Sequence, residues 1–341
     1  MAQNSWWQQF LSWLNSLLKP APAPPNPAQP TRNPNPSLPP QPFERSVLLI
    51  IFNPRIPSEG SRPLLEVMGW NSPVLLAQSY AAHLQDSSAG FARYSIVQTV
   101  EVDAIPHKVD GYLYTPDELL NVIRNRGAGA HQPDTADYEQ ILMDFNIPEM
   151  VDAGQVDEVW LFAFPYGGFY ESRMAGPGAF FCNAPPLGGA GGAGMRRYVI
   201  MGFNPERGVG EMLESFGHRC EDTLRRVYRS KTGAANLFER FCRYDLQNPG
   251  AAEVGTIHFA PNSQADYDWG NLRFVPSRCD TWLNFPDLSA EARQVNCVDW
   301  GSGDIRLHHA WWLRRLPHVS GETDGIRNNW WGYIIDPESV E

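Results

Sequence analysis

The run Ser46–Phe52, SVLLIIF, constrains the fold more than any other segment, because it is apolar at every position after the first. A continuous apolar run without alternation is typical of a strand that is covered on both faces. Ala92–Val102 alternates between apolar and polar residues and predicts a second strand, and Pro73–Gln85 between them has a helical pattern. The order strand, helix, strand predicts the start of an α/β sheet.

Two later apolar runs, Asp157–Phe164 and Arg197–Phe203, predict a third and a fourth strand. Helical patterns near Pro116–Asn125 and Asp137–Phe145 precede the third strand. We therefore expect a mainly parallel sheet with helices on both faces, followed by a long, irregular, aromatic-rich C-terminal region over 245–341.

The N-terminal residues differ in kind from this α/β domain, which we expect to span 46–341. Apolar residues between Ser5 and Lys19 recur at spacings of three and four, which predicts an amphipathic helix within 1–19. Prolines make up 11 of the 23 residues from 20 to 42, so 20–45 is expected to be an extended linker. The stretch lacks the basic start and unbroken apolar run of a standard signal peptide.

We expect residues 5–19 to dock onto a protein partner. A membrane surface is the second choice, because the polar side of the helix lacks Lys and Arg, and packing onto its own domain is the third. The formal net charge of -11 makes nucleic acid an unfavourable partner. Five cysteines without a CxxC pair predict mostly buried thiols and favour a reducing compartment such as the cytoplasm.

Polar and glycine-rich segments follow three of the predicted strands, at 53–55, 165–172 and 204–210. Ligands of open α/β sheets bind at the carboxyl ends of the strands. Three residues of these segments are candidates for catalysis: Tyr166, Glu171 and Arg207.

The helix that follows the fourth strand offers metal ligands. We predict that Asn204 caps it, that Pro205 is its first residue and that it continues over Glu211–Tyr228. Its polar side contains Glu214 and His218, which are four positions apart and able to hold one cation together. The alternative is that this side faces water, with its acidic residues complementing the helix dipole.

The segment Glu214-Ser-Phe-Gly-His218 resembles the HExxH helix of zinc peptidases over these five residues. Glu214 replaces the first histidine of that motif and Ser215 replaces its general-base glutamate. A glutamate and histidine pair suits a divalent transition metal such as Zn²⁺, Mn²⁺ or Fe²⁺.

His258 is the predicted third metal ligand, with a carboxylate as the alternative, and Asp266 and Asp268 follow it closely. The adjacent histidines His308 and His309 point in different directions on any regular element, so at most one is expected to join the site.

Two motifs fail on context. The GxGxxG pattern at 189–194 precedes a predicted strand instead of linking a strand to a helix, so we interpret it as a loop. The acidic pattern at 266–270 lacks the third acidic residue of a calcium loop and has Ser277 in place of its closing glutamate. The sequence also contains no GxSxG or Walker A motif.

These observations favour a metal-dependent hydrolase with Glu214, His218 and His258 as ligands and Glu171 as base. Tyr166 or Arg207 would stabilise developing negative charge. One alternative is a carbohydrate- or peptide-binding module that uses exposed tryptophans, the candidates being Trp269, Trp282, Trp311, Trp312, Trp330 and Trp331, although at least half of these are expected to fill the core instead. Another is a structural subunit tethered through its N-terminal helix.

Overall fold

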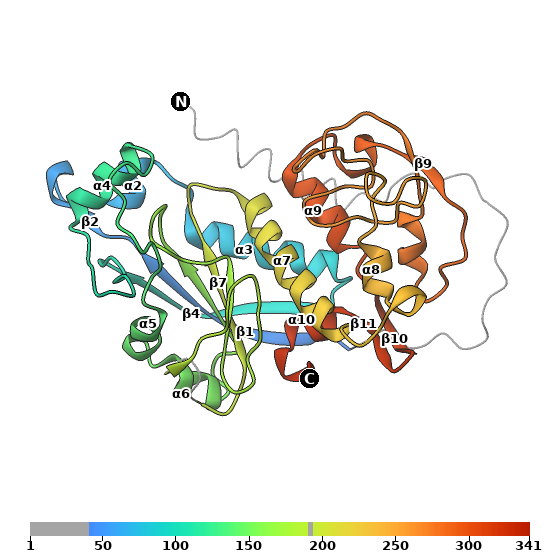
Figure 1. The fold of residues 1–341 in the computed structure, drawn as a ribbon. Helices are drawn as coiled ribbons and strands as arrows, with labels where there is room; N and C mark the ends of the chain where they lie inside the picture. Colours follow the sequence, from blue (N-terminus) through green and yellow to red (C-terminus); the bar gives the residue numbers. More distant parts are fainter. Residues whose placement is uncertain (1–40, 190–193) are drawn as a thin grey trace. The chain divides into compact units, whose positions relative to one another are not determined.

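The central sheet has five strands: β1 (Phe43–Phe52), β4 (Ala92–Val102), β5 (Glu158–Phe162), β6 (Ser172–Ala175) and β7 (Tyr198–Phe203). Figure 1 shows their arrangement in the computed structural model, which describes residues 41–189 and 194–341. The strand order is β4-β1-β5-β7-β6. All neighbours pair in parallel except β6, which is antiparallel to β7. The predicted α/β class and the mainly parallel sheet are therefore confirmed, whereas the predicted helix at 1–19 and most of the linker lie outside the described residues.

The four predicted strands are present, and the limits of β4 agree with the prediction. Along β1 and β4 the pairing shifts by one residue, because Val47 pairs with Ile96 while Leu48 pairs with Gln98. Val97 is the extra residue of this β-bulge and is 54% exposed.

The helices are α2 (Leu64–Met68), α3 (Pro73–Ser87), α4 (Pro116–Arg124), α5 (Tyr138–Asp144), α6 (Ile147–Asp152), α7 (Val209–Val227), α8 (Leu237–Phe241), α9 (Ile305–Leu313) and α10 (Trp331–Ile335). The remaining described strands form two-stranded antiparallel sheets. These are β2 (Arg55–Ile56) with β3 (Arg62–Pro63), β8 (Val275–Ser277) with β9 (Arg293–Val295), and β10 (His318–Thr323) with β11 (Ile326–Asn329).

Alternate residues of β1 enter two different hydrophobic clusters, because successive side chains of a strand point to opposite faces. Val47, Leu49 and Ile51 belong to one cluster, together with apolar residues of α3 and α7. Leu48 and Ile50 belong to the other, together with residues of α4, α5 and α6. This explains the unbroken apolar run that marks β1 in the sequence.

Helix α7 begins later than predicted. It starts at Val209, and the Gly208 amide donates a hydrogen bond of 3.1 Å to Glu211 Oε2. Asn204 and Pro205 lie in a turn in which the Arg207 amide donates to the Asn204 carbonyl oxygen, so their predicted capping role is wrong. A local side-chain cap three residues inside the helix replaces it.

A buried ion pair fixes α7 against the sheet. Arg219, which is fully buried, lies 2.8 Å from Glu158 Oε1 of β5 and also donates to the Ile334 carbonyl oxygen. A buried guanidinium needs such partners, because an unpaired charge in the interior is very costly. The pair therefore fixes the position of this turn of α7, which also contains His218, relative to the sheet.

The part of the chain after residue 250 packs its tryptophans inward. Trp269, Trp282, Trp300, Trp311, Trp312, Trp330 and Trp331 are all at most 7% exposed. The six candidate tryptophans for stacking on a sugar or a peptide thus belong to the hydrophobic core, as expected for at least half of them, and none of the six is exposed for such stacking.

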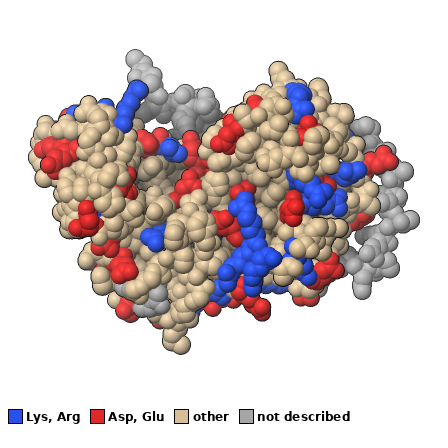
Figure 2. Space-filling view, in the orientation of Figure 1, with Lys and Arg blue, Asp and Glu red and all other residues tan. Residues whose placement is uncertain are grey.

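Acidic and basic side chains both occur on the face seen in Figure 2, so the negative net charge is not gathered there into one continuous field. Within 41–189 and 194–341, no helix combines the length and the apolar character that crossing a membrane requires.

Candidate metal centre

Glu214, His218 and His258 come together in the structure as the sequence predicts. Each offers one potential ligand atom, and these atoms all lie within 4.8 Å of one another. Glu214 and His218 occupy successive turns of α7, and His258 belongs to the irregular segment after α8. Glu214 is buried, whereas the His218 and His258 side chains are partly accessible, so the cluster is not a stripe that simply faces water.

Packing around Gly217 explains why His258 reaches α7. A Cβ atom at Gly217 would lie 2.4 Å from Cγ1 and Cδ1 of Ile257, so only glycine lets this segment approach so closely. The Ile257 amide also donates a hydrogen bond of 3.0 Å to Glu221 Oε1 on α7. Both contacts hold the residue next to His258 directly against the helix.

The antiparallel direction of β6 brings Glu171 to the same place. Glu171 precedes β6, and the amino end of an antiparallel strand lies at the carboxyl edge of its parallel neighbours. Its carbonyl oxygen accepts a hydrogen bond from the Gly202 amide near the end of β7. Its carboxylate Oε2 lies 3.9 Å from His218 Nε2 and accepts a hydrogen bond from Asn183 Nδ2.

Each of the two imidazoles lies between two carboxylates. His258 Nε2 is 3.0 Å from Glu214 Oε1, and its Nδ1 is 3.0 Å from Asp266 Oδ1. His218 Nε2 is 3.9 Å from Glu171 Oε2, and its Nδ1 is 3.7 Å from Glu221 Oε2. In metal sites, a ligating histidine usually presents one ring nitrogen to the ion while a carboxylate or carbonyl orients the other. Both histidines here have that arrangement.

The pKa values of the two glutamates are displaced in opposite directions. Burial raises the pKa of Glu171, and the Glu214 carboxylate adds to this effect. Burial also acts to raise the pKa of Glu214, but the hydrogen bond with His258 and the nearby imidazoles outweigh it and lower the pKa. Two carboxyl groups displaced in this way are suited to different roles, one as an acid or base and the other as a fixed anion.

The Glu214 hydrogen bond raises the pKa of His258. For His218, burial alone would lower the pKa, but the contacts with Glu221 and Glu171 raise it instead. A divalent cation would compete with a proton at both rings, because a metal ligand must be deprotonated.

Tyr267 is a neighbour that spacing and composition do not identify. Its ring centroid lies 4.5 Å from that of His258, and its backbone φ of 59° is in the left-handed region. Such a conformation costs a bulky residue about 1–3 kcal/mol and is concentrated at functional sites. Partial burial and the Glu214 carboxylate raise the pKa of the Tyr267 hydroxyl to about 12, so it remains a proton donor at neutral pH.

A hollow of about 220 Å³ adjoins the cluster, and Glu171, Glu214 and Arg207 all line it. The Arg207 side chain is 58% exposed, and its Nε lies 4.0 Å from Glu206, so its charge is available to a ligand. Tyr166 lines a neighbouring hollow of about 200 Å³, which shares Phe169 and Asn204 with the first. Of the two candidate anion stabilisers, the structure brings Arg207 to the hollow that Glu171 and Glu214 line.

The remaining candidates have other surroundings. Asp268 Oδ2 accepts hydrogen bonds from the Gln264 amide and from Asn271 Nδ2 within its own turn. His308 is fully buried and stacks on Trp269. Burial lowers the pKa of His309 to about 4, so this histidine is a neutral residue at pH 7.

The donor set fits a divalent transition metal better than Mg²⁺ or Ca²⁺, because imidazole nitrogen suits Zn²⁺, Mn²⁺ and Fe²⁺ while the harder ions prefer oxygen ligands throughout. Tetrahedral ligands about 2.0–2.2 Å from zinc lie about 3.3–3.6 Å apart. The 3.0 Å between His258 and Glu214 is near that range, and a modest inward movement of His218 would complete the set.

No protein-family model, curated protein or solved structure matches this chain.

Proposed function

We propose that the protein is a metal-dependent hydrolase whose cation is held by Glu214, His218 and His258. The observation that supports this most is the pair of imidazoles, each with one nitrogen toward a site carboxylate and the other beside Asp266 or Glu221. An acid-base cluster without a metal would not require a second carboxylate to orient each of the two rings.

When bound, a divalent transition metal such as Zn²⁺, Mn²⁺ or Fe²⁺ would act as a Lewis acid and lower the pKa of water. Glu171 lies at the edge of the cluster with a raised pKa, which suits it to take a proton from the attacking water and return it to the leaving group. Arg207 lines the same hollow and would stabilise negative charge that develops on the substrate. Asp266 would hold the ring of His258 in a fixed orientation, and Glu221 would do the same for the ring of His218.

Metal content tests the site directly. Protein purified without a histidine tag should contain close to one equivalent of Zn²⁺, Mn²⁺ or Fe²⁺ by elemental analysis, or take one up after treatment with a chelator. His218→Ala should lower the affinity for zinc by at least 100-fold. The matched control is His107→Ala, which removes an exposed histidine from another loop. Equal zinc binding by His218→Ala and the unchanged protein would refute the metal centre.

Activity tests the second half of the proposal. The zinc-loaded protein should cleave at least one of a panel of chromogenic carboxylic esters, phosphate esters and anilides. Glu171→Gln should reduce turnover by about 100-fold or more, the range of a lost general base, while zinc remains bound. Turnover that survives this substitution would remove Glu171 from the mechanism, and a metal-loaded protein without activity on the panel would argue against a hydrolase.

We also propose a reducing compartment for this protein. The five cysteines are free, and Cys182, Cys220, Cys279 and Cys297 are buried, which confirms the predicted buried thiols. Free thiols persist most readily where disulfides are kept reduced. Docking of residues 5–19 onto a protein partner remains our proposal for the N-terminal segment.

A further inference from the structure

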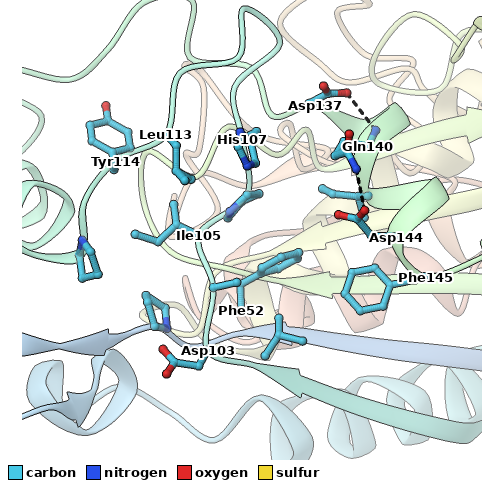
Figure 3. Close-up of a pocket in the computed structure, with 16 residues that line it drawn as sticks. Phe52, Asp103, Ile105, His107, Leu113, Tyr114, Asp137, Gln140, Asp144 and Phe145 are labelled. Atoms are coloured by element: carbon cyan, nitrogen blue, oxygen red, sulfur yellow. Dashed lines mark hydrogen bonds between the residues drawn. The ribbon is translucent and has the colours of Figure 1, made fainter.

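A third hollow lies at the carboxyl ends of β1 and β4, and none of its lining residues belongs to the metal centre. It has a volume of about 420 Å³ and is lined by Phe52 at the end of β1, Val102 at the end of β4, and residues of the following loop and of α5. Figure 3 shows these side chains around the opening. Small-molecule sites have volumes of roughly 300–1,000 Å³, so this hollow is large enough for a small ligand.

The topology of the sheet places a ligand-binding crevice next to this hollow. The chain continues from β1 to β4 on one side of β1, and then to β5 on the other side. The connections after β1 and β5 therefore leave in opposite directions. In open α/β sheets, such a reversal of strand order creates a crevice at the carboxyl ends, and ligands bind there. This crevice lies between β1 and β5, and the lining of the hollow adjoins it at the end of β1, with Phe52 and Pro54.

The wall of the hollow is mainly apolar and partly aromatic. Ile105, Leu113, Tyr114, Ile141 and Phe145 contribute to it. Leu113 is 46% exposed, although it lies among these apolar neighbours. A flat apolar group in the hollow would cover this side chain and remove apolar surface from water, which is favourable by roughly 25 cal/mol per Å².

The charged groups around the hollow are acidic. Its described lining includes Asp103, Asp137 and Asp144 but neither Lys nor Arg. Asp103 accepts a hydrogen bond from the Arg55 amide, and the Arg55 guanidinium is 3.9 Å away. Asp137 and Asp144 instead accept from uncharged groups, the backbone amide and the side-chain amide of Gln140.

These two bonds, drawn as dashed lines in Figure 3, use Oδ1 of each carboxylate and leave Oδ2 for a ligand. Two carboxylates without a described cationic partner attract a cation and repel phosphate or carboxylate groups.

We propose that this hollow binds a small aromatic amine in its protonated form. The ring lies against the apolar wall of the hollow, and the ammonium group donates a hydrogen bond to Asp144, while Asp137 at the other end of α5 adds negative charge to the surroundings. The hollow shares no residue with the metal centre. A failure of the proposed hydrolase activity would therefore leave the proposed amine binding unaffected.

Three probes of similar size test the proposal on the full chain: phenethylamine, which is cationic, phenethyl alcohol, which is neutral, and phenylacetate, which is anionic. Binding is measured by ligand-detected saturation-transfer NMR and by calorimetry, with the metal removed and again with zinc added. We expect phenethylamine to bind at least 10-fold more tightly than phenylacetate, with phenethyl alcohol between them, and zinc to leave this order unchanged.

Two variants locate the bound amine. Asp144→Asn removes one charge from an exposed position and should weaken phenethylamine binding by about 3- to 10-fold while leaving phenethyl alcohol unchanged. Leu113→Trp should fill the hollow and abolish binding of both compounds. Leu75→Trp is its matched control, because Leu75 is 44% exposed on α3 and does not line the hollow.

Three results would overturn the proposal: no saturable binding of phenethylamine at millimolar concentration, equal or tighter binding of phenylacetate, or undiminished binding to Leu113→Trp.

Discussion

At the scale of single residues, Asp280 shows how one carboxylate joins distant parts of the chain. Its Oδ1 accepts a hydrogen bond of 2.6 Å from Arg315, and its Oδ2 accepts one from Arg293, which also binds Asp299. Burial acts to raise the pKa of Asp280, but the two arginines outweigh it and lower the pKa below its usual value. Its charged form is therefore the one that stabilises the fold.

Asp280→Asn should lower the free energy of unfolding at pH 7 by about 1–2 kcal/mol, a value reduced for the partial exposure of the carboxylate. Because the folded-state pKa is lowered, the contribution is complete above the unfolded pKa of about 4 and is lost as the pH falls through the folded pKa. Urea unfolding at pH 7 and pH 3 should show a difference between the two proteins that narrows in acid.

The control is Asp324→Asn, at an exposed turn where the neighbouring Lys231 binds a backbone oxygen and not the carboxylate. A constant difference between Asp280→Asn and the unchanged protein across this pH range would contradict the prediction.

At the scale of elements, α7 connects the sheet to the candidate metal centre. Arg219 binds β5, Glu214 and His218 lie in the preceding turns, and Gly217 accepts the segment that contains His258. The ligand geometry thus depends on how closely one loop can approach the helix. A helix of this kind positions side chains more accurately than a loop does.

Gly217→Ala should test this dependence. The added methyl group would overlap Ile257, which must move and would take His258 away from Glu214 and His218. We expect zinc affinity to fall at least 10-fold while the protein stays folded, because alanine is the better helix former. Competition with a chromogenic chelator measures the affinity, and circular dichroism measures the helix content.

Ser215→Ala on the same helix is the matched control for that substitution, since it removes only a hydroxyl that bonds to Glu211 within the helix. Zinc binding by Gly217→Ala at the affinity of this control would show that the close approach is not required.

The elements predicted from the sequence are those with a strong local pattern. Ser46–Phe52 and Ala92–Val102 were predicted correctly as strands. The first is a continuous apolar run and the second alternates between apolar and polar residues, and both patterns are typical of strands. β6 was not predicted, since Ser172–Ala175 has only four residues and forms a strand because β7 offers it an edge. The local sequence of these four residues does not indicate that β7 is available to pair with them.

The residues of the candidate site also differ in how far local sequence predicts them. Glu214 and His218 are predictable because the helical repeat alone brings them together. His258 was found from residue type, but its contact with Asp266 and the position of Tyr267 depend on the path of an irregular loop. The capping of α7 at Gly208 was missed because Pro205 gives a stronger local signal three residues earlier.

At the scale of the whole molecule, the metal centre collects residues from distant segments. Glu171 precedes β6, Glu214 and His218 belong to α7, and His258 and Asp266 lie in the irregular part of the chain. An unfolded chain cannot hold these side chains together. A cation that binds them therefore binds the folded state selectively and stabilises it by mass action.

Zinc should accordingly raise the melting temperature of the metal-free protein. At 100 times its dissociation constant, the added stability is about 2.7 kcal/mol, which corresponds to several degrees for a protein of this size. Differential scanning fluorimetry should show the rise, with reversal by EDTA and little response to Mg²⁺. An equal rise in His218→Ala would place the stabilising zinc elsewhere on the molecule.

The β-bulge at Val97 has a consequence for the behaviour of the protein in concentrated solution. β4 is at one end of the strand order, where exposed backbone groups are able to template the addition of a strand from another copy. The bulge bends that border and interrupts its regular hydrogen-bonding pattern, and Arg93 and Glu101 place charges along it. A long terminal strand is thereby protected from fibril-like self-association.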